Sequence, residues 1–262
     1  GTNVLAFHAL NDRADSSDFL LQPELVRARD YESRYLTPPT PGAPNSTGVL
    51  DFVADTAFSV DRGFFDAPFD VEISTSTPGA AIWYTTNGSG PSPASAAATR
   101  YSGPIRIAKT TTLRAMAALD DYQPTNVDTQ TYIFISHVRT QSATQPGLPT
   151  TWAGGYAADY GVDPDVVNTT LAGYGFEDAL LSIPTLSLVT DPDGLFGAAT
   201  GIYSNSQGRG LAWERAASIE LIRPDGRPGW QADCGIRMHG NSSRDHGFTP
   251  KHPIRLLFRA RY

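Results

Sequence analysis

The sequence is poor in cysteine and contains no long apolar run. Among its 262 residues there is one cysteine, Cys234, so no disulfide can form within the chain, and we interpret its side chain as a small buried apolar group. No apolar stretch approaches the roughly 20 residues that a membrane-spanning helix needs, so no membrane span is expected. Gly1 is followed by a strand-like pattern rather than by the regions of a signal peptide, so any export signal is expected upstream of it.

Charged residues are also scarce, at 18% of the chain, and acidic residues outnumber basic ones, which gives a formal net charge of -7 at pH 7. A nucleic-acid partner requires a basic face that neutralises phosphates, and the arginines here are scattered except near the C-terminus. The composition therefore argues against a nucleic-acid partner.

Turn-forming residues, in contrast, are abundant. The 24 glycines and 20 prolines interrupt short stretches in which apolar and polar side chains alternate. Short strands joined by many turns are typical of β architecture. We predict a mainly β fold that contains a β-sandwich, a second β-rich (α+β) partial domain and an orphan pair of strands at the N-terminus.

Changes of pattern divide the chain into five segments. They are a strand pair at 1–30, a proline-rich linker at 31–50, the sandwich at 51–137, a connector at 138–178 and the partial second domain at 179–262. In the connector, Asp163-Pro-Asp165 predicts the start of a helix, with Asp163 as its cap.

Alternating stretches give the expected strands. In the sandwich they are Phe69–Ser74, Ala81–Thr86, Tyr101–Ala108, Thr111–Ala118 and Thr129–Phe134, and in the second domain Ile183–Val189, Gly201–Ser204, Ala217–Ile222, Gly235–His239 and Pro253–Phe258. A hairpin is expected to turn at Asn87-Gly88, because both residue types adopt positive φ at low cost.

Several stretches of the sandwich segment resemble the chitobiase/β-hexosaminidase C-terminal domain. They are Gly79–Ser89, Tyr101–Ile105, Thr110–Ala117 and Thr131–Ile133. The resemblance implies an immunoglobulin-like sandwich that is appended, usually as a non-catalytic module, to secreted carbohydrate-active and surface proteins. Asn87 stands where the family usually has an aspartate, which keeps the turn and weakens the case for cation binding.

Two further resemblances concern the N-terminal segments. Thr2–Leu10 and Asp15–Leu25 resemble the closing strands of a galactose-binding-like jelly roll. The proline-dense stretch Tyr35–Asn45 resembles the exit of lamin-tail-like modules, and its prolines predict a stiff linker. Both resemblances point to large secreted bacterial proteins.

The last third of the chain resembles the N-terminal part of the spore-coat CotH kinase-like family. The motifs appear in order and include Ile183–Val189, Trp213-Glu214-Arg215, Pro224-Asp-Gly226 and Gly240–Arg244. The resemblance implies a nucleotide-binding lobe, in which Lys251 matches a lysine that pairs with phosphates. The carboxylates that hold Mg²⁺ would have to lie beyond the C-terminus, so we expect no cofactor in this chain, and ATP and Mg²⁺ only with a complete kinase domain.

The loop that follows Gly235–His239 holds the candidate nucleotide-binding residues. They are Gly240, Asn241, Ser242, Ser243, Arg244 and Lys251. The first four would offer backbone amides and hydroxyls to phosphate oxygens, and the two basic side chains would supply positive charge. The alternative, which we favour for this chain, is structural: Gly240 turns a hairpin, the serines are solvated and Arg244 forms a surface ion pair.

The remaining polar clusters predict no chemistry. Trp213-Glu214-Arg215 predicts a salt bridge that locks a loop. His239, His246 and His252 have spacings that fit no short ligand pattern, so no metal site is predicted. No catalytic residue is identified, because a catalytic triad is recognised by its geometry rather than by its residues.

Trp83 is the candidate for carbohydrate stacking. If its neighbours Ile82 and Tyr84 face the core, Trp83 faces outward, where an indole can stack on a sugar ring. Packing against a neighbouring domain is the other interpretation, and the commoner fate of such a side chain.

Together these observations predict a non-catalytic fragment of an exported multidomain bacterial protein, extracellular or on the cell surface, with a structural or adhesive role. Its expected partners are neighbouring domains of the parent chain, copies of itself or a glycan. Two alternatives stay open. One is a subunit of an extracellular fibre that assembles by exchange of N-terminal strands, and the other is the nucleotide-binding lobe of a CotH-like protein kinase.

Overall fold

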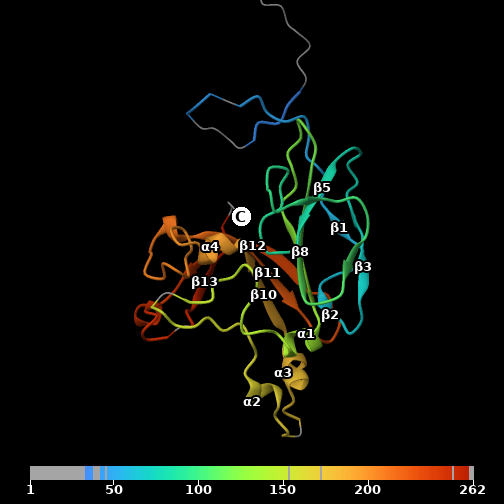
Figure 1. The fold of residues 1–262 in the computed structure, drawn as a ribbon. Helices are drawn as coiled ribbons and strands as arrows, with labels where there is room; N and C mark the ends of the chain where they lie inside the picture. Colours follow the sequence, from blue (N-terminus) through green and yellow to red (C-terminus); the bar gives the residue numbers. More distant parts are fainter. Residues whose placement is uncertain are drawn as a thin grey trace, which may run out of the picture.

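A computed structural model describes residues 33–37, 42–44, 46–152, 154–171, 173–249 and 251–259. The strands expected at Thr2–Leu10 and Asp15–Leu25 lie outside these residues. The described residues form mainly β-strands in several sheets, which confirms the predicted fold class (Figure 1).

The first unit is a sandwich around a five-stranded sheet with the order β2-β9-β8-β5-β6, packed against the strand pairs β1-β4 and β3-β7. The strands are β1 Ala57–Phe58, β2 Gly63–Phe64, β3 Phe69–Val71, β4 Ile73–Ser74, β5 Ala81–Thr85, β6 Thr99–Arg100, β7 Ile105–Ile107, β8 Thr111–Ala118 and β9 Asp128–Ile133. The bounds of β8 are those expected from the sequence, whereas the expected strand Phe69–Ser74 splits at Glu72 and its halves pair with different partners.

The alternation of β8 explains why it is the central strand. Leu113, Ala115 and Ala117 point into the sandwich core, where they meet side chains from the opposing pairs. Arg114 and Met116 point to the other face and are also buried. Both faces of the strand are therefore covered, one by the sandwich itself and the other by the second unit.

The expected tight hairpin at Asn87-Gly88 is wrong. β5 pairs with β6, which begins only at Thr99, and Asn87 instead forms an isolated bridge with Thr112. Gly88 has a φ of 85°, but Asn87 is not among the described residues with positive φ, and its Oδ1 accepts a hydrogen bond of 3.1 Å from the Ser89 amide. The Asn87 side chain closes a local turn, and the chain continues to Thr99 before it pairs with β5.

The second unit is an antiparallel sheet with the order β10-β11-β12-β13. Its elements are β10 Thr185–Thr190, α4 Pro192–Phe196, η1 Leu211–Trp213, β11 Arg215–Ile222, β12 Trp230–Met238, η2 Ser242–Arg244 and β13 Ile254–Leu257. Cys234 is fully buried in its core, as the sequence interpretation expected. The expected strand Gly201–Ser204 is a series of turns whose Ile202 fills the same core.

The connector covers the second unit with aromatic side chains. The short helices α1 Ile135–Arg139 and α3 Phe176–Ser182 lie across its two ends, and α2 Pro164–Val167 lies within it. The ring of Trp152 lies 5.7 Å from that of Tyr203, and the ring of Tyr160 lies 6.5 Å from that of Phe196. Asp163 caps α2 by accepting a hydrogen bond of 2.9 Å from the Asp165 amide, as predicted.

The described parts of the proline-rich segment pack on the sandwich. Tyr35 and Val49 exchange backbone hydrogen bonds of 2.8 and 2.9 Å, and the Tyr35 ring meets that of Phe52 at 5.2 Å. This pairing closes the segment into a loop whose two ends lie together.

The two units meet face to face. The face of the five-stranded sheet that carries Arg114, Thr129 and Thr131 lies against β11 and β12, and Figure 1 shows the second sheet beside β8. Nothing among the described helices has the length and apolar character that crossing a bilayer requires.

Candidate functional site

The Gly240–Lys251 loop begins with a glycine that its backbone requires. Gly240 has a φ of 95°, and a Cβ at this position would lie 2.0 Å from the Ser243 Oγ. The next residues form the 3₁₀ turn η2. Gly240 therefore makes the close turn that the structural interpretation of the loop gave it.

Arg244 is buried, with 8% of its surface exposed, and holds the loop from inside. Its guanidinium donates to the carbonyls of Gly240 at 2.8 Å, Ser206 at 3.2 Å and Gly208 at 2.7 Å, and also to that of Met238. Burial lowers the pKa of this guanidinium, and the nearby arginines add to the effect. The expected surface ion pair of Arg244 is therefore wrong, because the buried guanidinium donates its hydrogen bonds to backbone carbonyls.

Lys251 and Asn241 lie on the outside of the same loop. Lys251 is exposed and precedes β13, which begins at Ile254, so it is not on a strand as expected. Asn241 is exposed and its Oδ1 accepts a hydrogen bond of 3.3 Å from Arg209. The loop thus brings together Gly240, Asn241, Ser242 and Ser243, but it separates the two predicted cationic groups, one of which is buried and the other exposed.

The Trp213-Glu214-Arg215 motif does lock a loop, but with other partners than expected. Glu214 has no exposed side-chain surface and pairs with Arg237 and, at 3.2 Å, with Arg259. Arg215 instead donates to carbonyl oxygens, among them those of Thr200 and Ala212, and its guanidinium lies over the Trp213 ring.

Trp83 lies on the face of β5 opposite to Ile82, as the alternation predicts. It pairs with Met116 on β8 and with Arg100 on β6, and its side chain is partly exposed. This is the face that turns toward the second unit at Arg114.

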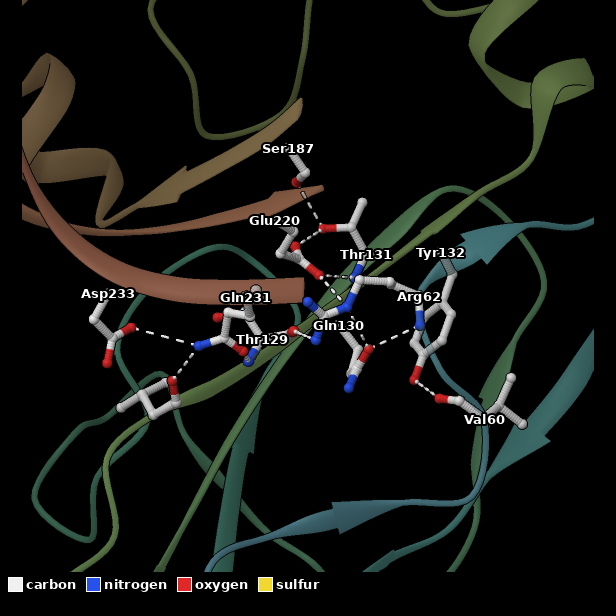
Figure 2. Close-up of polar contacts among 11 residues, drawn as sticks. Val60, Arg62, Thr129, Gln130, Thr131, Tyr132, Ser187, Glu220, Gln231 and Asp233 are labelled. Carbon is white, nitrogen blue, oxygen red and sulfur yellow. Dashed lines mark hydrogen bonds and ion pairs between the residues drawn. The ribbon is translucent and has the colours of Figure 1, made fainter. Parts of the chain in front are cut away.

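The most buried polar cluster lies where the two units meet (Figure 2). Glu220 on β11 is 0% exposed, and its carboxylate accepts hydrogen bonds from both the amide, at 3.0 Å, and the hydroxyl of Thr131 on β9. The Arg62 Nε lies 3.4 Å from the same carboxylate. Burial raises the pKa of Glu220, and its hydrogen bonds and Arg62 oppose this effect only in part.

Further hydrogen bonds extend this cluster along β9, and Figure 2 shows them on either side of Glu220. Gln130 accepts from the Arg62 amide at 2.8 Å. The Gln231 Oε1 on β12 accepts from the Thr129 amide at 2.7 Å, and its Nε2 donates to the Val127 carbonyl at 3.2 Å. β2 pairs with β9 only at Tyr132 and Ile133, so the amides of Thr129 and Thr131 lie along an edge of β9 that has no neighbouring strand, and side chains of the second unit accept their hydrogen bonds.

A cavity of about 540 Å³ opens beside this junction. Its polar lining includes Asp61, Asp128 and Asp233, with Gln130 and Gln231 between them. Burial raises the pKa of both Asp128 and Asp233. No group of three or more His, Cys, Asp or Glu side chains in the described residues is placed to hold a metal ion.

The sequence interpretation missed this junction. Its one local signal is Glu220, a carboxylate inside the otherwise apolar stretch Ala217–Ile222. Its partners Arg62 and Thr131 come from a different unit, and no local pattern links them to it.

The comparisons with known proteins bear on the sandwich alone. Residues 60–129 match the family described as Chitobiase/beta-hexosaminidase C-terminal domain, which is immunoglobulin-like, so the resemblance of these residues is confirmed. No curated protein and no solved structure matches the chain. None of the comparisons supports a CotH kinase-like part.

Proposed function

We propose that this chain is a non-catalytic structural part of a larger exported surface protein, in which the chitobiase-type sandwich holds the second β unit in a fixed orientation. The observation that supports the proposal is the buried polar junction around Glu220. Burying the Glu220 carboxylate costs free energy unless Arg62 and Thr131 of the sandwich lie beside it. The carboxylate therefore favours one arrangement of the two units over others.

The chemistry of the loop supports a structural role as well. Arg244, the more central of the two predicted phosphate ligands, already donates to backbone carbonyls. A phosphate would have to displace these bonds, and the buried carbonyls would then lose their donors. We therefore expect neither turnover nor a shift of the melting temperature when millimolar ATP and Mg²⁺ are added to the protein. A measured phosphoryl transfer would contradict the proposal.

Calorimetry tests the fixed orientation. The protein is expected to unfold in one cooperative transition, because the junction couples the two units. Glu220→Ala leaves Arg62 without its carboxylate and removes the acceptor of Thr131, so the transition should split in two. Glu72→Ala, at an exposed position of the sandwich, is the matched control and should leave one transition. Two separate transitions in the unmodified protein would contradict the proposal.

An adhesive role is a second candidate, favoured by the partly exposed indole of Trp83. It predicts that the protein binds a glycan on an array and that Trp83→Ala removes the binding. Binding that survives this substitution would place the glycan elsewhere.

A further inference from the structure

The cavity beside the Glu220 junction has walls from both units. Asp128 and Gln130 of β9 line it, from the part of the strand that has no neighbour on its outer edge, and so do Gln231 and Asp233 of β12. Its volume of about 540 Å³ falls in the range of roughly 300–1,000 Å³ that is usual for sites of small ligands. A ligand in this cavity would therefore touch the sandwich and the second unit at once.

Gln130 presents an unused donor to the cavity. Its Oε1 accepts hydrogen bonds from the backbone amide of Arg62 at 2.8 Å and from the Arg62 Nε at 3.2 Å. Both of these groups can only donate, so the oxygen of the Gln130 amide must face Arg62 and the Nε2 must point elsewhere. Among the described residues no acceptor meets this Nε2, although the nitrogen stays accessible to solvent. Since Gln130 is only 7% exposed, its Nε2 reaches solvent through the cavity that the residue lines.

Three carboxylates line the same space and supply only acceptors. Asp61 is exposed and makes no hydrogen bond or ion pair within the described part of the chain. Asp128 accepts from the Thr56 hydroxyl. Asp233 accepts from the Gln231 Nε2 at 3.5 Å. A carboxylate has roughly four lone-pair sites, so each of the three keeps capacity for further donors.

These groups together select a ligand that both donates and accepts hydrogen bonds. A carboxylate can only accept and the Gln130 Nε2 can only donate, whereas a hydroxyl does both. Hydroxyls on adjacent carbon atoms, as in a sugar ring, would meet several of these groups at once. Phe58 adds an aromatic ring to the lining, and the C–H face of a sugar can pack on such a ring.

We propose that this cavity binds a sugar unit that carries no acidic group, through hydroxyls that donate to Asp61 and Asp233 and accept from the Gln130 Nε2. Burial already raises the pKa of Asp128 and Asp233, so a further negative charge beside them is unfavourable. Trp83 lies outside the lining, so this site is separate from the adhesive candidate on β5.

Nuclear magnetic resonance of the whole chain tests the site directly. Glucose, galactose, mannose, xylose and glucosamine are added in turn at millimolar concentration, and at least one of them should shift the side-chain NH₂ signals of Gln130. Glucuronate should leave these signals in place, because the three carboxylates repel its own. The proposal is wrong if none of the five sugars shifts the Gln130 signals, or if glucuronate shifts them as strongly.

Two substitutions locate the binding of the sugar that shifts these signals. Asp61→Asn replaces a carboxylate acceptor at an exposed position and should weaken the affinity by about tenfold, as expected for losing a hydrogen bond to a charged group. Gln130→Glu keeps an oxygen toward Arg62 but removes the donor, and it should abolish binding. The matched control is Asp66→Asn, which is also exposed and lies outside the lining, and it should leave the affinity unchanged.

Three results would overturn the proposal. The first is an affinity that stays the same in both Asp61→Asn and Gln130→Glu. The second is an affinity that is lost in Trp83→Ala, because the sugar would then bind on β5. The third is a shift of the Gln130 signals by butylamine that is as strong as the shift by the sugars, because the cavity would then recognise a positive charge rather than hydroxyls.

Discussion

Glu220 shows how a single carboxyl can make the stability of this protein depend on pH. Its side chain is fully buried, and burial raises its pKa above the ordinary value. A carboxyl whose pKa is higher in the folded state binds its proton more tightly there than in the unfolded chain. Its contribution to stability therefore falls as pH rises from the ordinary value of about 4.3 through the raised one.

We predict that Glu220→Gln removes this part of the pH dependence. Below both values the variant and the parent should be similarly stable, because the carboxyl is neutral in both states. As pH rises, the variant should gain stability relative to the parent, since it buries no charge. Urea unfolding at pH 4, 6 and 8 measures this, and a relative stability that stays constant across the series would contradict it.

Arg244 gives a second prediction at the same scale. Arg244→Met leaves the carbonyls of Ser206, Gly208 and Gly240 without their buried donor, so unfolding should become easier by about 3 kcal/mol. Arg227→Met is the control, because Arg227 is exposed and pairs with Asp225 in its own turn, and it should change stability by less than about 0.5 kcal/mol. Thermal unfolding of both variants checks the difference. Equal effects would show that Arg244 does not organise the loop.

Among the elements, two short helices begin with the same sequence motif, Asp-Pro-Asp. Asp163-Pro-Asp opens α2 and Asp191-Pro-Asp opens α4, and in each the first aspartate accepts a hydrogen bond of 2.9 Å from the amide two residues on. The first was predicted from the sequence. The second was not predicted, although its first aspartate caps the helix in the same way.

The two caps should differ in their effect on stability. Neither helix has a fully buried residue, but α4 packs the partly buried Leu195 against the core of the second unit, whereas none of the four residues of α2 packs against either core. We predict that Asp191→Ala destabilises the protein by about 1 kcal/mol and that Asp163→Ala has a smaller effect, because loss of a cap matters where the helix also packs. Urea unfolding of the two variants compares them directly. The idea fails if Asp163→Ala has the larger effect.

The sequence predicted the elements whose apolar and polar residues alternate within one segment. It did not predict the elements whose structure depends on contacts with residues far away in the chain. β8 was placed with its observed bounds because Leu113, Ala115 and Ala117 alternate with other residues on one strand. Gly201–Ser204 was misassigned because one buried side chain, Ile202, supports a turn as readily as a strand. At the candidate site, the turn at Gly240 follows from the conformational freedom of glycine itself, whereas the carbonyls that accept from Arg244 come from two separate segments, around Ser206–Gly208 and Met238–Gly240, and leave no local signal.

On the scale of the whole molecule, a set of buried polar contacts joins the two units. Two threonines of β9, Thr129 and Thr131, differ in the hydrogen bonds that their hydroxyl groups make at this junction. Thr131 donates both its amide and its hydroxyl to Glu220, while the hydroxyl of the fully buried Thr129 has no hydrogen-bond partner among the described residues.

This contrast gives a matched pair of variants. Thr131→Val removes a donor from a buried carboxylate and should destabilise the protein by about 2 kcal/mol, whereas Thr129→Val removes an unsatisfied hydroxyl and should be neutral or stabilising. Both replacements keep the shape of the side chain, so packing changes little. Calorimetry distinguishes them, and a larger loss for Thr129→Val would contradict the arrangement of the junction.

The covered strand β8 also decides where this protein can be labelled. The side chains of Leu113 to Ala117 are buried on both faces of the sheet. A dye or spin label attached there would have to separate either the layers of the sandwich or the two units. The side chains of Asp225 and Arg227, in the turn between β11 and β12, are exposed to solvent. Reporters for distance measurements belong on that turn, which leads directly into β12 and would follow the second unit without disturbing what it reports.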